Sequence, residues 1–242
     1  MKIAFFSDIH ANLPALEAFF EDIEIVNPDA IYCLGDLVGY NIWPNEVVAE
    51  IRKRRIPVIM GNHDEALLNP IVLEDQSSNR GLTRAMISEN NRNYLINLPR
   101  HLSLSFASDD VFFNCLLVHG SVNSINDYMV VDYPEQDVLA MMNRNQTDVL
   151  LCGHTHKPFH RRIENNGQIK HVINIGSIGK PKDGDTRGCY ALVELSQSPN
   201  TNDAEAVQVS FRRVAYDVEK AARAVEASKF DNQFAEALRL AR

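Results

Sequence analysis

The sequence lacks several features that would point to a membrane, exported or repetitive protein. It contains no uninterrupted apolar stretch of 18 residues, so it has no candidate for a membrane-spanning helix. The first apolar run, Ile3–Phe6, is too short for a secretory signal peptide. With only 11 glycines and 10 prolines, the composition also excludes a collagen-like or low-complexity chain. We therefore expect a cytoplasmic protein with no membrane partner.

The chain contains few cysteines, and their spacing does not indicate a metal site. The four cysteines form no CxxC pair, and each lies in or beside an apolar run: Cys33, Cys115, Cys152 and Cys189. This pattern favours reduced, buried thiols in a cytosolic protein. The alternative is one or two disulfides in an exported protein.

The chain has no excess of positive charge. Lys and Arg number 24 against 32 Asp and Glu, which gives a net charge of -8. An acidic chain is poorly suited to follow a nucleic-acid backbone unless it has a local basic groove. The densest basic run, Arg52–Arg55, is interpreted as the solvated end of a helix, where the helix dipole favours cations. A nucleic-acid partner is therefore not expected.

Periodicity predicts an α/β fold. The 242 residues are 45% hydrophobic and show neither a linker nor an internal repeat, so we expect a single domain over 1–242. Strands and helices alternate in the first half, which predicts a parallel sheet covered by helices. The expected strands there are Ile3–Phe6, Ala30–Leu34, Val58–Met60, Ser103–Phe106, Val111–Val118 and Asp148–Leu151, and the helices are Leu13–Ile25, Asn45–Arg54, Ser77–Asn97 and Glu135–Arg144.

The second half is richer in strands. The expected strands are Phe159–Glu164, Lys170–Asn174, Cys189–Leu195 and Val207–Val214, followed by a helical segment, Val218–Leu240. Asn165–Gln168 is a hairpin-turn signal. Together the two halves predict two packed sheets with helices outside. The helical region 77–97 either caps a site or belongs to an outer layer.

Five short polar motifs each follow an expected strand. They are Asp8-Ile9-His10, Gly35-Asp36, Gly61-Asn62-His63-Asp64, His119-Gly120 and Gly153-His154-Thr155-His156. Five of the eight histidines fall in these motifs, which a uniform scatter would not produce. Since α/β folds place their sites at the carboxyl ends of strands, the motifs are expected to converge.

The residue types indicate a metal site of mixed oxygen and nitrogen ligands. Asp8, Asp36 and Asn62 would act with four or five histidines and no thiolate, which favours manganese, iron, zinc, cobalt or nickel. Seven ligands exceed the needs of one ion once water is counted, so two ions sharing a carboxylate are expected. Such a site keeps a net positive charge and favours an anionic substrate such as a phosphate.

The motifs resemble those of the calcineurin-like metallophosphoesterase superfamily. SDIHANLPAL, CLGDLVGY, GNHD, VHGS, LCGHTHKPF and the later NIGSIGKPKDGDTRGCYALVEL carry the resemblance, which covers about four fifths of the chain. Ile175 replaces a proline common in relatives, with no expected loss of chemistry. The resemblance implies a four-layer α/β/β/α sandwich of two mixed sheets with a di-metal site at one edge.

The resemblance also implies residue roles. Asp8, His10, Asp36 and His156 would hold one metal; Asp36 would bridge to a second, completed by Asn62, His119 and His154. His63 would contact the phosphate, stabilise charge or protonate the leaving oxygen, while Asp64 would orient the His63 imidazole and raise its basicity. Tyr40, Lys180 and Arg187 are the further candidates for substrate contact.

The expected activity is hydrolysis of phosphate esters or anhydrides by a hydroxide held between two divalent ions, with manganese expected first. The substrate would be a nucleotide or another small phosphorylated compound. A protein serine/threonine phosphatase, a dinucleoside polyphosphate hydrolase and a catalytically silent scaffold are the alternatives. The sequence leaves open the preference for monoesters or diesters and the oligomeric state.

Overall fold

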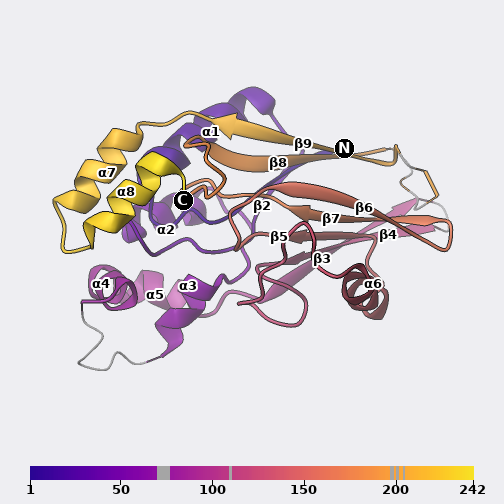
Figure 1. Ribbon diagram of the computed structural model, residues 1–242, viewed down its shortest axis with the longest axis horizontal. Helices are drawn as coiled ribbons and strands as arrows, with labels where there is room; N and C mark the ends of the chain where they lie inside the picture. The colour runs from indigo at the N-terminus through magenta and orange to yellow at the C-terminus, as the bar shows by residue number, and fades with distance from the viewer. Residues whose placement is uncertain (70–76, 109–110, 197–198, 200–201, 204) are drawn as a thin grey trace.

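Two mixed β-sheets stack face to face in the computed structural model, which describes residues 1–242 except 70–76, 109–110, 197–198, 200–201 and 204 (Figure 1). The first sheet has the strand order β2-β1-β8-β9, and the second has the order β3-β4-β5-β7-β6. The strands of the first sheet are β1 (Lys2–Phe6), β2 (Ala30–Cys33), β8 (Gly188–Leu195) and β9 (Val207–Val214). Those of the second are β3 (His101–Ser108), β4 (Val111–Val118), β5 (Val149–Cys152), β6 (Phe159–Asn165) and β7 (Gln168–Asn174).

The first sheet has its parallel pair at one edge, the second has parallel strands at its centre, and antiparallel pairs complete both. β1 runs parallel to β2 with Phe5 opposite Tyr32, and antiparallel to β8. β5 runs parallel to both β4 and β7. The parallel strands therefore end side by side, which is what brings the polar motifs together.

Helices cover the outer faces. They are α1 (Leu13–Val26), α2 (Pro44–Lys53), α3 (Asn62–Glu65), α4 (Asn79–Met86), α5 (Glu89–Leu95), α6 (Glu135–Arg144), α7 (Val218–Glu226) and α8 (Asn232–Leu240), with a short 3-10 turn, η1 (Ala66–Leu68), after α3. Figure 1 places α1 and α6 on opposite outer sides of the stacked sheets, with α7 and α8 at one end and α3 to α5 below them. The described residues contain no helix long and apolar enough to cross a membrane.

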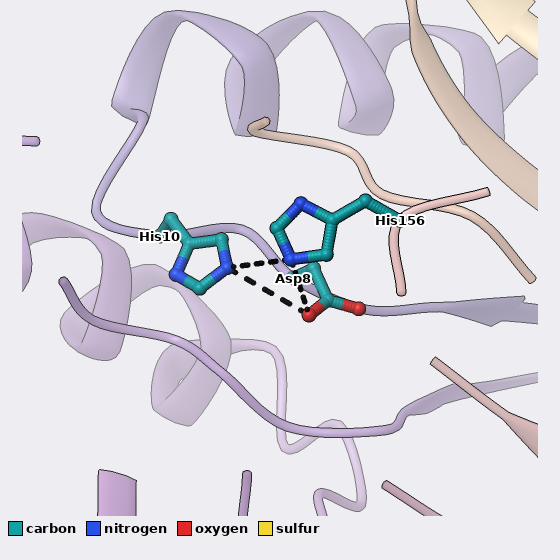
Figure 2. A group of neighbouring side chains, drawn as sticks. All are labelled: Asp8, His10 and His156. Atoms are coloured by element: carbon teal, nitrogen blue, oxygen red, sulfur yellow. Dashed lines mark hydrogen bonds and ion pairs between the residues drawn. The ribbon is translucent and has the colours of Figure 1, made fainter. Parts of the chain in front are cut away.

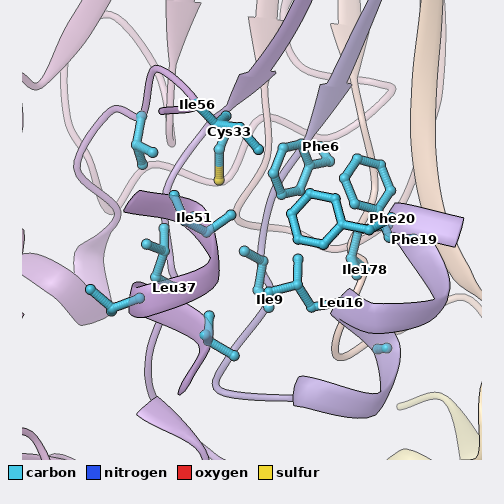
Figure 3. Packing of buried hydrophobic residues seen from close by; sticks show 14 of the residues in the cluster. Phe6, Ile9, Leu16, Phe19, Phe20, Cys33, Leu37, Ile51, Ile56 and Ile178 are labelled. Atoms are coloured by element: carbon cyan, nitrogen blue, oxygen red, sulfur yellow. The ribbon is translucent and has the colours of Figure 1, made fainter. Parts of the chain in front are cut away.

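Three hydrophobic clusters separate the four layers. Phe5, Leu117 and Val193 belong to the cluster between the two sheets. A second cluster packs α1 and α2 on the outer face of the first sheet, where the ring centroids of Phe6 and Phe19 lie 4.3 Å apart (Figure 3). The third packs α6 on the second sheet. The predicted α/β/β/α sandwich is confirmed, and all four cysteines are buried with free thiols.

Three predicted elements differ from the structure. The segment 58–60 forms only an isolated bridge, between Cys33 and Val58, because it is too short to continue a ladder. The region 77–97 contains two helices, α4 and α5, because the Ser88 side chain caps a new helix by accepting a hydrogen bond from the Asn91 N–H. The region 218–240 is likewise split, since Asp231 caps α8. The predicted hairpin turn at 165–168 is confirmed, since it joins the antiparallel strands β6 and β7. β3 and β4 also pair antiparallel, and 109–110 between them lie outside the described residues.

Candidate metal centre

The polar motifs come from both sheets and meet at one edge of the sandwich. Asp8 and Asp36 follow β1 and β2 of the first sheet, whereas His119 and His154 follow β4 and β5 of the second. Their side chains form overlapping groups whose possible ligand atoms lie within 4.8 Å of one another: Asp8, His10 and His156; His10, Asp36 and His63; and Asp36, His119 and His154.

The first group is built around one carboxylate oxygen of Asp8. Its Oδ1 lies 3.1 Å from His156 Nε2 and 3.7 Å from His10 Nε2, and the two Nε2 atoms lie 3.1 Å apart (Figure 2). The other oxygen, Oδ2, accepts a hydrogen bond from the His154 backbone N–H at 3.1 Å. One oxygen is therefore fixed by the backbone while the other points at two imidazole nitrogens.

A carboxylate oxygen of Asp36 occupies the equivalent place in the group with His119 and His154. Its Oδ2 lies 3.4 Å from His119 Nε2 and 3.6 Å from His10 Nε2, so this oxygen faces both groups. Its Oδ1 accepts the His63 backbone N–H at 2.8 Å. Asn62 adds its Oδ1 at 3.0 Å from His119 Nε2. An oxygen shared in this way suits a bridging ligand.

Three buried polar atoms in these groups have no hydrogen-bond partner. They are Asp8 Oδ1, Asp36 Oδ2 and His154 Nε2. An unpaired buried carboxylate oxygen or imidazole nitrogen costs about 1–3 kcal/mol or more, so such atoms are rare without a reason. Their convergence with neutral-nitrogen and carboxylate donors fits a divalent cation.

The imidazoles are oriented by the backbone. His10 Nδ1 lies 3.1 Å from the Val38 carbonyl, His119 Nδ1 lies 2.8 Å from that of Leu34, and His156 Nδ1 contacts the carbonyl of Lys180. When Nδ1–H donates to a carbonyl, the lone pair resides on Nε2 and faces the centre. The donor set is thus arranged before any ion binds.

The buried charges at the centre shift the pKa values of its carboxylates and imidazoles. Burial alone would raise the pKa of Asp8 and Asp36, but the neighbouring histidines, His156 and His119 respectively, hold both below their ordinary value. Burial acts to lower the pKa of His119, yet the charge of Asp36 raises it to about 10. Asp8 and Asp36 therefore stay ionised among the imidazoles, and a bound cation would compete with protons for the same donor atoms.

His63 belongs to the group with His10 and Asp36, and the buried Asp64 follows it in the chain. The His63 ring centroid is 4.9 Å from that of His10 and 4.7 Å from that of Tyr40. The carboxylate of Asp64 accepts three backbone N–H groups, from Asp36 at 2.9 Å, Gly61 at 3.0 Å and Leu37 at 3.1 Å. Backbone donors thus contact both Asp64 oxygens, which gives Asp64 a structural role in fixing the loop that carries Asp36; its predicted effect on the His63 imidazole stays a prediction.

The three residues predicted to contact substrate do not all lie near the ligand groups. Tyr40 packs edge-on against His10, with ring centroids 4.8 Å apart, and Lys180 Nζ lies 5.0 Å from the Tyr40 ring centroid. Arg187 instead bonds Asp185 through two nitrogens, at 3.0 and 2.7 Å, and its guanidinium is exposed. The structure thus brings Tyr40 and Lys180 to the centre and leaves Arg187 on the surface.

Two further residues lie near the centre, of which Tyr128 was missed as a candidate. Tyr128 has its ring centroid 4.4 Å from that of His154. Burial lowers the pKa of Lys182, while the charges of Asp8 and Asp36 act to raise it. The segment 176–188, whose basic residues include Lys180 and Lys182, pointed to Lys182 from the sequence; Tyr128 lies in a loop without periodicity, so no local pattern pointed to it.

Comparison with known proteins agrees with this geometry. Residues 1–198 match the model of the calcineurin-like phosphoesterase superfamily domain. An uncharacterized protein of Methanocaldococcus jannaschii is 31% identical, with 99% of this chain and 98% of that protein covered. The crystal structure of a metallophosphoesterase from Sphaerobacter thermophilus is 27% identical, with a TM-score of 0.79 and complete coverage of both chains. A hypothetical protein of Pyrococcus horikoshii shares the fold at 23% identity and a TM-score of 0.79, with 98% of this chain and 97% of that one covered. The chain therefore belongs to the calcineurin-like phosphoesterase superfamily, whose members use divalent metals, and it is a metallophosphoesterase, a hydrolase that acts on ester bonds.

Proposed function

We propose that the protein binds two divalent cations and hydrolyses a phosphoester of a small compound, with a nucleotide-type diester as the first candidate. The observation that carries the proposal is the set of unpaired buried atoms, Asp8 Oδ1, Asp36 Oδ2 and His154 Nε2, which lie in two ligand groups joined at Asp36. Of the three unpaired atoms, only Asp36 Oδ2 lies near histidines of both groups, His10 in one and His119 in the other. A single cation could therefore bind the donors of one group but not those of the other.

The ligands divide between two ions. Asp8, His10, Asp36 and His156 would hold the first, and Asp36, Asn62, His119 and His154 the second. Oxygen and imidazole donors without thiolate suit manganese first, and also iron, zinc, nickel or cobalt. When bound, such ions supply positive charge that polarises the phosphoryl group and lowers the pKa of a water molecule.

The chain's own groups act on the ester around these ions. In hydrolysis a water oxygen bonds to phosphorus, the ester P–O bond breaks, and the leaving oxygen gains a proton. The His63 imidazole lies in the group with His10 and Asp36 but belongs to neither assigned ligand set, so it is placed to stabilise the charge that develops or to protonate the leaving oxygen. Burial lowers the pKa of His63, which helps it release a proton once it holds one.

Lysines supply positive charge at the rim. Lys180 is buried against Tyr40, and its Nζ donates to the Arg242 carbonyl at 3.1 Å. Burial lowers the pKa of Lys180 to about 8, which leaves it charged at neutral pH. Together with Lys182 it could bind a second phosphate or phosphate oxygen of the substrate. The partner is therefore proposed to be a small phosphorylated molecule rather than a nucleic acid or a membrane.

A structure described as that of a novel archaeal phosphodiesterase shares this fold at 19% identity, with a TM-score of 0.50 over 88% of this chain. It is one reason to place diesters first. A protein serine/threonine phosphatase, a dinucleoside polyphosphate hydrolase and a silent scaffold remain the rivals.

The decisive experiment combines turnover with metal binding. Chelator-treated protein is titrated with manganese by calorimetry and assayed on bis-p-nitrophenyl phosphate, p-nitrophenyl phosphate, nucleotides, dinucleoside polyphosphates and a phosphopeptide. We expect two equivalents of metal, turnover on a diester, and loss of turnover but not of metal binding in His63→Ala. Two bound metals with no turnover on any substrate would favour the scaffold, and fewer than two would refute the assigned ligand sets.

A further inference from the structure

Apolar side chains are exposed directly beside the polar metal centre. Tyr128 is 58% exposed, Val130 40% and Val131 59%, whereas Met129 between them is buried. These three residues, the Tyr128 patch, account for three of the seven large apolar side chains exposed in the part of the chain that the structure describes. Clustered exposed apolar groups mark binding surfaces more often than isolated ones do.

The patch is held in place rather than loosely attached. Asp127 precedes Tyr128; its N–H donates to the Ser124 carbonyl at 3.2 Å, and its carboxylate accepts the Tyr133 hydroxyl at 3.0 Å. On the far side the Arg161 guanidinium donates to the Tyr133 carbonyl at 2.6 Å. Anchors on both sides of the patch reduce the ordering cost of binding a ligand there.

Tyr128 and Tyr40 approach the centre through different histidines. The Tyr128 ring packs on His154 at 4.4 Å, tilted by 45°, and the Tyr40 ring packs on His10 at 4.8 Å. Of the two rings, Tyr128 is the more exposed and is therefore free to receive a second planar group.

We infer that Tyr128 is a specificity-determining residue that stacks on a planar aromatic group of the phosphoester, of the nucleobase type. The inference rests on the proposed phosphoester hydrolysis and names the part of the substrate beyond the phosphate. A ligand phosphate at the cluster and a ring on Tyr128 are compatible, since the phenol touches the imidazole of His154 itself. Because every base has a π-face, stacking selects bases as a class without selecting one base.

The test compares two diesters with the same leaving group, thymidine 5′-p-nitrophenyl phosphate and methyl p-nitrophenyl phosphate. Base stacking on an aromatic side chain is worth about 1–3 kcal/mol, so Tyr128→Ala should lower kcat/KM for the thymidine ester about 5- to 150-fold, mainly through KM. The methyl ester should change less than about twofold. Tyr128→Phe keeps the ring and should restore most of the difference. Ile25→Ala, which truncates an apolar side chain that is 81% exposed on α1, is the matched control.

Several outcomes would overturn the inference. Equal losses on both esters would make Tyr128 a structural support of His154, and no loss on either would leave it without a substrate role. A changed oligomeric state of Tyr128→Ala with unchanged KM would assign the patch to a protein interface. If the wild type turns over neither ester, the proposed function fails separately. The affinities of the wild type and of Tyr128→Ala for thymidine 5′-monophosphate and for methyl phosphate are then measured by calorimetry. If Tyr128→Ala weakens only the binding of thymidine 5′-monophosphate, stacking is supported. If the variant binds thymidine 5′-monophosphate as tightly as the wild type does, stacking is refuted.

Discussion

Asp64 offers a sharp test because sequence and structure give it different roles. Its side chain is fully buried and accepts backbone N–H groups from Asp36, Leu37 and Gly61. Replacing Asp64 with Ala leaves three buried donors without an acceptor. Each orphaned donor costs about 1–3 kcal/mol, and water entering the space would recover part of it. We therefore expect Asp64→Ala to lower the free energy of unfolding by about 3–5 kcal/mol, a large share of the usual 5–15 kcal/mol.

The measurement is urea unfolding of chelator-treated protein. Burial, then the charge of Asp36, raises the pKa of Asp64 to about 7, so the assay is run above that pH, where the carboxyl is ionised. Asp64→Asn keeps an oxygen where two of the three donors converge and should lose less, about 1–3 kcal/mol. Asp217→Ala, which removes an exposed helix cap on Lys220 N–H, is the control and should cost about 1 kcal/mol.

Metal binding supplies a second readout. Since the Asp64 carboxylate holds the backbone of Asp36, its loss should also weaken manganese binding measured by calorimetry. His63→Ala should not weaken it. If Asp64→Ala kept its stability and metal affinity but lost turnover as His63→Ala does, then Asp64 would act through the His63 imidazole and the reasoning here would fail.

Three further expectations follow from buried groups. Manganese at about 100 times its Kd should stabilise the wild type by about 2.7 kcal/mol in thermal melting, and Asp36→Asn should abolish most of that gain; an equal gain in the variant would place the metal elsewhere. The pKa of His171 is lowered to about 4, first by burial and then by the charge of His160, so the folded state keeps it neutral while the unfolded chain protonates it near its ordinary value of 6.5. Stability should therefore fall as pH drops from about 6.5 to 4, by at most about 3 kcal/mol, and urea midpoints of His171→Asn should show a flatter pH dependence. Phe19→Ala, at a fully buried ring packed on Phe6, should cost about 3–5 kcal/mol in urea unfolding while leaving manganese affinity intact; a loss of both would mean that this core positions the site.

The site could be predicted best from the sequence where polar residues follow a buried strand. Buried runs such as Ile3–Phe6 could be assigned from their apolar continuity, and Asp8 and His10 then had to lie at a strand end. Since parallel strands end side by side, the convergence of Asp8 and Asp36 was predictable from order alone.

Other features depend on contacts between distant segments and leave no local pattern. Asp64 bonds Asp36 across 28 residues, so its structural role could not be inferred from its place beside His63. Tyr128 reaches His154 from a loop with no periodicity. By contrast, the break before Asn232 had a local signal in the capping residue Asp231, which the continued helical spacing obscured.

The backbone at the centre shows that its geometry is selected for ligand placement and not for stability. Asp8, His10, Asp36, His154 and His156 all have positive φ, between 51° and 64°. Non-glycine residues in this region cost about 1–3 kcal/mol where the conformation is strained, and asparagine, aspartate and histidine tolerate it best. Five such residues in one cluster, with buried ligand atoms left unpaired, oppose folding in the absence of a cation. The surrounding sandwich must supply the stability that holds them, so substitutions that remove a ligand charge, unlike those in the core, should leave the metal-free protein as stable as before or more stable.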